Sequence, residues 1–184
     1  PGGTANSDTT GTMNLVVDDV ESPEDTLVLS GSSSNTGLVP NSGITFAGTG
    51  AARTVTITTN ARASGTSIVT VTVSDQEGGT ASVNITVIVG GNRANTLMGT
   101  EDADLFFGRN DADAIFGLGG NDLASGGNGE DTIDAGAGDD GMWGRQGVDT
   151  LTGGTGADAF NGGGGVDTAT DFNAGDGDTQ TGIP

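Results

Sequence analysis

A period of nine residues governs the second half of this 184-residue chain and constrains its fold more than any other feature. From Gly90 the sequence divides into nine consecutive nonapeptides without an insertion, and the last of them ends at Thr170. Strict internal repetition of this kind is typical of a structural unit that stacks on copies of itself. Residues 90–170 are therefore expected to form an array of equivalent stacked units.

Two positions of the nonapeptide keep their character throughout the array. The sixth position is acidic or an amide in every repeat: Asn95, Asp104, Asp113, Asp122, Asp131, Asp140, Asp149, Asp158 and Asp167. The eighth position is apolar in every repeat: Leu97, Phe106, Ile115, Ala124, Ile133, Met142, Leu151, Phe160 and Ala169. One aspartate in a loop is an ordinary turn residue, but eight at a constant spacing predict a shared chemical role. A short strand around each eighth residue is expected to bury that side chain in a continuous core.

The charge of the chain indicates which partner these aspartates would take. There are 25 acidic residues against five Arg and no Lys, which leaves a net charge of −20, and 25 of the 36 glycines lie after residue 89. This charge disfavours nucleic acid and anionic membranes as partners and favours cations. No stretch approaches the length of apolar sequence that membrane insertion requires.

Carboxylates and backbone carbonyls are hard oxygen ligands, which a hard cation such as calcium binds six to eight at a time. Glycine allows backbone carbonyl groups to come close to a metal. One nonapeptide offers a single regular carboxylate, so a complete ligand shell must be shared between turns. Without metal, repulsion within the array of carboxylates opposes stacking, and folding and calcium binding are expected to be one equilibrium.

The repeats at 126–134 and 153–161 match the pattern G-G-x-G-x-D-x-U-x, where U is a large apolar residue, and they resemble RTX calcium-binding repeats. The resemblance implies a parallel β-roll in which two nonapeptides form one coil, so that repeat n stacks on repeat n+2. It implies calcium between pairs such as Asp113 with Asp131 and Asp131 with Asp149. The metal ligands implied in this way are Asp104, Asp113, Asp122, Asp131, Asp140, Asp149, Asp158 and Asp167, with Asn95 as a ninth.

Some residues depart from the pattern. The first three repeats carry Arg93, Asp102 and Asp111 in place of the glycine at position four, so weak or absent calcium binding is expected there. The segment from residue 171 resembles the one that closes such rolls and is expected to cap the last coil with Phe172 and Ile183. Four acids of the roll outside position six are expected to be solvated: Glu101, Glu130, Asp134 and Asp139. Before the roll, a solvated turn is expected at Asp18, Asp19, Glu21, Glu24 and Asp25, and the alternative there is a cadherin-like calcium site.

The first half follows different rules. Short β-branched runs, several of them alternating, predict strands at 13–17, 26–29, 44–47, 54–58, 67–73 and 81–89, with a hairpin turn at 75–79. This pattern is typical of a β-sandwich. The segments Ser30-Gly31-Ser32-Ser33-Ser34-Asn35, Leu38-Val39-Pro40-Asn41, Thr54-Val55-Thr56-Ile57 and 65–75 resemble the cadherin-like, immunoglobulin-like domains of bacterial surface proteins.

The predicted organisation is thus an all-β chain with an immunoglobulin-like β-sandwich at 1–89 and a parallel β-roll at 90–184, capped from residue 171. Only a Gly-, Thr- and Asn-rich stretch precedes residue 13. The sandwich is therefore expected to be short of a first strand. Either the sequence begins inside the domain, or a neighbouring chain completes the sheet edge by strand addition.

The outward faces of the roll can be predicted from positions seven and nine, since these flank the buried eighth residue. One face is expected to be mostly polar: Thr96, Met98, Ala114, Phe116, Thr132, Asp134, Thr150, Thr152, Thr168 and Thr170. The other carries Leu105, Phe107, Leu123 and Trp143, which predict an exposed apolar patch. An intermolecular contact, packing of the first domain over the patch, and chance are the open alternatives.

The functional prediction is a secreted calcium-binding structural or adhesive protein, such as a self-assembling subunit of an extracellular filament, matrix or surface layer. Its partners would be calcium ions and further copies of itself or other surface proteins. The alternative is the C-terminal, calcium-triggered folding module of a larger type I secreted toxin, hydrolase or adhesin. Catalysis is not expected, because the chain has no His, Cys, Tyr or Lys from which to build a nucleophile and base.

Overall fold

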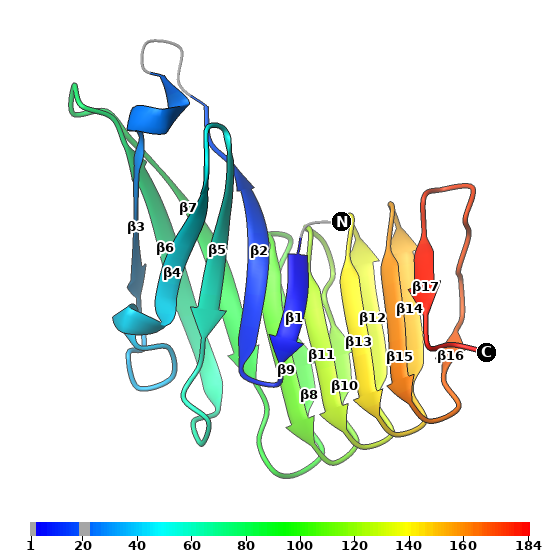
Figure 1. Cartoon of the computed structure of the whole chain (residues 1–184). Helices are drawn as coiled ribbons and strands as arrows, with labels where there is room; N and C mark the ends of the chain where they lie inside the picture. The colour runs from blue at the N-terminus through cyan, green and yellow to red at the C-terminus, as the bar shows by residue number, and fades with distance from the viewer. Residues whose placement is uncertain (1–2, 19–22) are drawn as a thin grey trace.

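The computed structural model describes residues 3–18 and 23–184, with the backbone alone at residues 5–7. Strands account for almost all of its regular structure, and two short 3-10 helices, η1 (Glu24–Thr26) and η2 (Asn41–Gly43), lie in connections (Figure 1). Within the described ranges, no helix has the length and apolar character needed to span a membrane.

The strands form three sheets (Figure 1). The N-terminal sheet is antiparallel in the order β1-β2-β5-β4, with β1 (Gly3–Ser7), β2 (Thr10–Val16), β4 (Ile44–Thr49) and β5 (Ala52–Thr58). The shared sheet has the order β17-β15-β13-β11-β9-β7-β6-β3, with β3 (Val28–Ser33), β6 (Gly65–Ser74), β7 (Thr80–Val89), β9 (Asp104–Asn110), β11 (Leu123–Asn128), β13 (Gly141–Gln146), β15 (Ala159–Gly164) and β17 (Thr179–Thr181). The second roll sheet has the order β16-β14-β12-β10-β8, with β8 (Thr96–Met98), β10 (Ala114–Phe116), β12 (Thr132–Ala137), β14 (Thr150–Thr155) and β16 (Thr168–Ala169).

The nonapeptides form the predicted parallel β-roll. Each strand pairs in parallel with the strand two repeats later, as Ile115 does with Ile133 in one sheet and Ala124 with Met142 in the other. The eighth residues meet between the two roll sheets, where eight of the nine are buried and Ala169 packs against them. The outward residues of the second roll sheet are exposed or half-exposed, as expected.

Strand β7 belongs to both halves of the chain. It pairs antiparallel with β6 of the sandwich and parallel with β9 of the roll, where Thr86 lies opposite Asp104 and Ile88 opposite Phe106. Ile88 is buried in the roll core, 18 residues before Phe106. The spacing of the roll therefore begins inside the last strand of the sandwich, and one continuous sheet joins the two halves.

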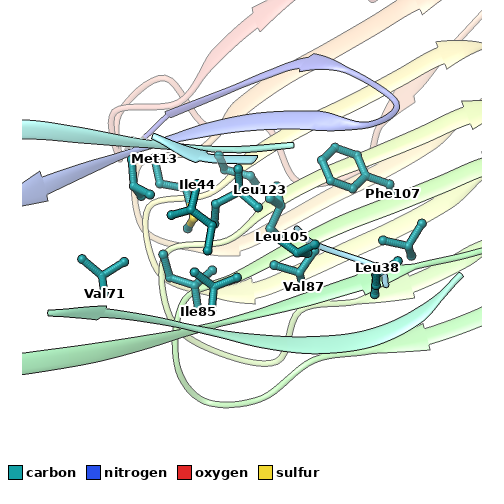
Figure 2. Packing of buried hydrophobic residues seen from close by; sticks show 14 residues of the cluster. Met13, Leu38, Ile44, Val71, Ile85, Val87, Leu105, Phe107 and Leu123 are labelled. Atoms are coloured by element: carbon teal, nitrogen blue, oxygen red, sulfur yellow. The ribbon is translucent and has the colours of Figure 1, made fainter. Parts of the chain in front are cut away.

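The apolar patch predicted at Leu105, Phe107, Leu123 and Trp143 is not exposed. The first three are at most 1% exposed and belong to the core between the N-terminal sheet and the shared sheet, and Trp143 is half-buried against that core. Figure 2 shows Leu105 and Leu123 among side chains of the sandwich, with Ile44 and Val87 labelled beside them. Of the alternatives left open by the sequence, packing of the first domain over the patch is the one that the structure shows.

The expectation of a missing strand before residue 13 was also wrong. The Gly-, Thr- and Asn-rich stretch forms β1, which pairs with β2 and lies over β11 and β13 of the roll. Glycine makes this close approach possible: a β-carbon added to Gly3 would lie 2.7 Å from Cδ1 of Leu123, and one on Gly11 would meet Leu105. The glycines therefore let the β1–β2 hairpin cover the roll.

The last coil is closed by the C-terminal segment, as predicted. The ring of Phe172 packs edge-on against Phe160 with 6.1 Å between the ring centroids. Ile183 packs against the end of the roll core. These two side chains cover the last apolar layer of the roll core, on the side where no further repeat stacks.

Candidate metal centre

The aspartates at position six form two hydrogen-bonded columns along the roll. In each column the backbone N–H of one residue donates to Oδ1 of the residue 18 positions later, at 2.7–2.9 Å. One column contains Asn95, Asp113, Asp131, Asp149 and Asp167, and the other contains Asp104, Asp122, Asp140 and Asp158. The structure thus brings together the residue pairs that the repeat pattern predicted, and their role as metal ligands stays a prediction.

The second oxygen of six of these carboxylates is buried without a partner. Within the part of the chain that is described, Oδ2 has no hydrogen bond in Asp113, Asp122, Asp131, Asp140, Asp149 and Asp167. A buried carboxylate oxygen that is not compensated is strongly unfavourable, so such groups are either protonated or held by a cation. Six such atoms, repeated along the roll, have the donor chemistry of a cation site.

Glycine at position one lies beside five of these six oxygens, and the repeat of Asp140 begins with Ala135 instead. A β-carbon added to Gly162 would lie 2.7 Å from the carbonyl oxygen of Gly182 and closer still to Oδ2 of Asp167. At Gly144 it would lie 2.7 Å from the carbonyl oxygen of Gly162 and close to the carboxylate of Asp149. Carboxylate and carbonyl oxygens that converge on one space are the ligand types that calcium uses.

Burial raises the pKa of the column aspartates. Desolvation is the largest cause, and it brings the pKa to about 8 for Asp122, about 7 for Asp131 and Asp140, and about 6 for Asp113. The hydrogen bond from the neighbouring backbone lowers the pKa of each, and neighbouring carboxylates raise it. In the metal-free roll, burial therefore disfavours the ionised form of the column carboxylates.

The first two repeats differ from the later ones, whereas the third has an unpaired Oδ2 at Asp113, as the later repeats do. Oδ2 of Asp104 accepts hydrogen bonds from the backbone N–H of Thr100 at 2.6 Å and from its hydroxyl at 3.1 Å, so this oxygen is already paired. Oδ1 of Asn95 accepts from the backbone N–H of Gly91 at 2.8 Å. Asp111 takes the left-handed φ of 70° that glycine favours in this turn.

Sequence reasoning missed the last member of the second column. The backbone N–H of Asp158 donates to Oδ1 of Asp178 at 2.9 Å, and β17 then pairs with β15. The spacing is 20 residues rather than 18, which hides the relation from a nine-residue count. A signal was present, because Asp178-Thr179-Gln180-Thr181 has the same D-T-x-T form as Asp149-Thr150-Leu151-Thr152.

The structure describes most of the acids that lie outside the columns. In the described residues, no three acidic side chains gather at one point, so backbone carbonyls must complete any calcium shell. Before the roll, Oδ1 of Asp25 accepts from the backbone N–H of Gly50 at 2.6 Å, which is a structural bond. Asp19 and Glu21 lie outside the described residues.

Family comparisons agree with this arrangement. Residues 2–88 match the bacterial Ig domain, and residues 89–124, 117–151 and 142–169 match the RTX calcium-binding nonapeptide repeat. The chain matches no curated protein and no solved structure. The boundary between the two matches falls at the end of β7, where the shared sheet passes from the sandwich to the roll. The chain therefore consists of a bacterial Ig domain followed by RTX calcium-binding nonapeptide repeats.

Proposed function

We propose that this chain is a secreted structural or adhesive module whose roll folds and stiffens when it binds calcium outside the cell. The observation that carries the proposal is the set of six buried, unpaired Oδ2 atoms in two regular columns. Burial of these six oxygens would destabilise the roll if it folded without a cation. Extracellular calcium is abundant enough to suit sites of modest affinity.

The column aspartates would hold the metal between successive coils, together with backbone carbonyls of the glycine-rich turns. The residues concerned are Asp104, Asp113, Asp122, Asp131, Asp140, Asp149, Asp158 and Asp167, with a smaller contribution expected at Asn95 and Asp104. Bound calcium would supply the positive charge that keeps the buried carboxylates ionised. An aspartate in the interior of a column, such as Asp131, would then contribute to the metal positions on both sides of its coil.

The shared sheet supports a mechanical role, because it gives the two halves no flexible linker. Arg109 adds a second connection: its Nη1 donates to the carbonyl oxygen of Ala63 at 2.6 Å, and its Nη2 donates to that of Asn60 at 2.9 Å. Arg109 has a φ of 83°, a conformation that costs a non-glycine residue about 1–2 kcal/mol. Ordering of the roll would therefore be transmitted to the sandwich.

Self-assembly into a filament, matrix or surface layer stays within this proposal, but the patch at Leu105, Phe107 and Leu123 is no longer a reason for it. Those side chains fill the core of the same molecule. Any contact between copies, or with other surface proteins, would have to use another surface. The proposal assigns no catalytic role to the chain.

The proposal is tested by titrating calcium into metal-stripped full-length chain, with circular dichroism and calorimetry as readouts. Strand content and the cumulative heat of binding should change together, with a midpoint on the order of 10⁻⁴ to 10⁻³ M calcium. Small-angle scattering should show a particle that is more compact in calcium than in chelator and elongated in shape. A metal-stripped chain with full strand content and no calcium-dependent heat would remove the proposal.

A further inference from the structure

A polar hollow lies on the shared sheet where the cover of the N-terminal sheet ends. It has a volume of about 590 Å³, and three glycines form part of its lining. Its side chains come from β11, β13, β15 and the turn between β1 and β2: Trp143, Arg145, Gln146, Asn128, Asn161 and Asp8. The calcium columns contribute no residue to this lining. We call it the tryptophan hollow.

Trp143 lies where the N-terminal sheet stops covering the shared sheet. Phe107 and Ser125, which precede it in the same cross-strand row, are fully buried, whereas Trp143 is half-buried and Asn161 follows it. The six-membered ring of Trp143 extends over Gly141, since a β-carbon there would lie 2.8 Å from Cη2. The indole is thus held against the sheet and still contributes to the hollow.

Arg145 occupies a backbone position that favours glycine. Its φ is 83°, and its neighbours in the same row, Gly127 and Gly163, have φ values of 111° and 94°. Left-handed backbone at a non-glycine residue is strained and is often found at functional sites. The Nε of Arg145 donates to Oγ of Ser125 at 3.1 Å and lies 3.6 Å from Oδ1 of Asp8, so the guanidinium is fixed at the hollow.

The remaining polar groups are neutral amides. Asn128 donates through one Nδ2 hydrogen to Oδ1 of Asn110 at 2.9 Å, which orients its side chain. Gln146 lies opposite Gly164 in the adjacent strand and is exposed. Neighbouring strands are about 4.8 Å apart, so side chains from β11, β13 and β15 present polar groups across about 10 Å.

We infer that the tryptophan hollow binds a neutral saccharide. An indole offers an apolar face with a polar edge, which suits a sugar ring with C–H groups on one side and hydroxyl groups around it. Fixed amide and guanidinium groups supply directional hydrogen bonds, as specific ligand sites require. A neutral ligand is favoured over an anionic one because Asp8 balances Arg145 and the whole chain carries a net charge of −20.

This inference goes beyond calcium-dependent folding, and its test is made on the calcium-loaded full chain. Trp143 is the only tryptophan, so its fluorescence reports on the hollow alone. Dextran, laminarin and cellohexaose serve as neutral probes and hyaluronan as an anionic one. We expect a saturable change in Trp143 emission with at least one neutral probe and none with hyaluronan.

Two variants assign the binding to the hollow. Asn161→Ala removes one amide, and Arg145→Gly removes the guanidinium while leaving a residue that suits the left-handed turn. Each should weaken binding by about 3- to 10-fold, the effect of one lost hydrogen bond. Thr132→Ala, on the second roll sheet, should bind as the parent does.

Calcium stoichiometry measured on each variant shows that the roll is still folded. Absence of any fluorescence change with all three neutral probes would overturn the inference. So would binding that Asn161→Ala and Arg145→Gly leave unchanged, or binding to hyaluronan alone.

Discussion

The backbone N–H of Asp131 donates to Oδ1 of Asp149 at 2.8 Å, 18 residues further along the chain. Oδ1 of Asp131 in turn accepts the N–H of Asp113 at 2.8 Å. Asp131 therefore uses its backbone towards one neighbouring coil and one carboxylate oxygen towards the other. Its second oxygen, Oδ2, has no hydrogen-bond partner in the described part of the chain.

Replacing Asp131 should affect two neighbouring calcium positions. Asp131→Ala leaves the N–H of Asp113 without its acceptor and removes a carboxylate from the spaces on both sides. We expect calorimetry to show about two fewer calcium ions per chain. Asp134→Ala is the matched control, because Asp134 is exposed and outside the columns, and it should keep the parent stoichiometry. Equal losses in the two variants would contradict the arrangement.

Replacing Phe107 should destabilise both halves together. Phe107 belongs to a roll repeat but is fully buried in the core of the sandwich, so Phe107→Ala should lower the free energy of unfolding by about 3–5 kcal/mol. Thermal unfolding in calcium should remain a single transition at a lower temperature. Phe116→Ala, a half-exposed position on the second roll sheet, should have a much smaller effect. Two separate transitions in the parent chain would contradict a shared core.

Acid should favour the metal-free roll and oppose the calcium-bound one. The pKa values of Asp113, Asp122, Asp131 and Asp140 are raised from 3.8 to about 6, 8, 7 and 7, so the folded metal-free chain binds more protons than the unfolded one. Its stability is then greatest below pH 3.8 and is lost as the pH rises through about 6 to 8. Calcium needs ionised ligands, so its affinity should rise over the same interval.

Metal-stripped chain should therefore show more strand signal at pH 4.5 than at pH 8 in circular dichroism. In excess calcium the order should reverse. Asp122→Asn should weaken the pH dependence of the metal-free chain, because it removes the column residue whose pKa is raised furthest among those four. Equal strand signal at both pH values without metal would contradict the burial of ionisable carboxylates.

Asp178 should hold the last coil in place. Its Oδ1 accepts the N–H of Asp158 and its Oδ2 accepts the N–H of Asn173 at 2.8 Å. Asp178→Ala leaves two donors unpaired and should cost about 1–3 kcal/mol of stability, with faster amide exchange in β15 and β17. Gln180→Ala, at an exposed residue of β17, should leave exchange unchanged. Identical protection in both variants would show that the cap does not depend on Asp178.

The residues that sequence reasoning placed correctly are those whose role repeats every nine positions. The side chains at position six align in columns and those at position eight fill the core, since a strict period fixes both the turn and the strand in each unit. Leu105 and Phe107 were placed correctly as pointing out of the roll, but alternation within a strand does not say what covers an outward side chain. The cover is the β1–β2 hairpin, whose glycines were mistaken for a stretch without a strand.

Two other features could not be predicted from the nine-residue pattern, for related reasons. Thr86 stands where an aspartate would be in a further repeat, so the nine-residue pattern is not visible before Gly90 although β7 already pairs with the roll. Asp178 follows a two-residue insertion and lies out of phase. Both are ends of the array, where the chain must stop repeating in order to join another element or to close.

The pairing of β7 with β9 also decides which of several nearly equivalent alignments the repeats adopt. If the array slipped by one coil, Asp122 would take the place of Asp104 and the columns would remain intact. Leu123 would then replace Leu105, but Ser125 would replace Phe107, and the sandwich core would contain a hydroxyl and a void in place of an aromatic ring. A slip of one coil therefore removes the aromatic residue that this core receives from the strand beside β7, so the pairing of β7 with β9 opposes that slip.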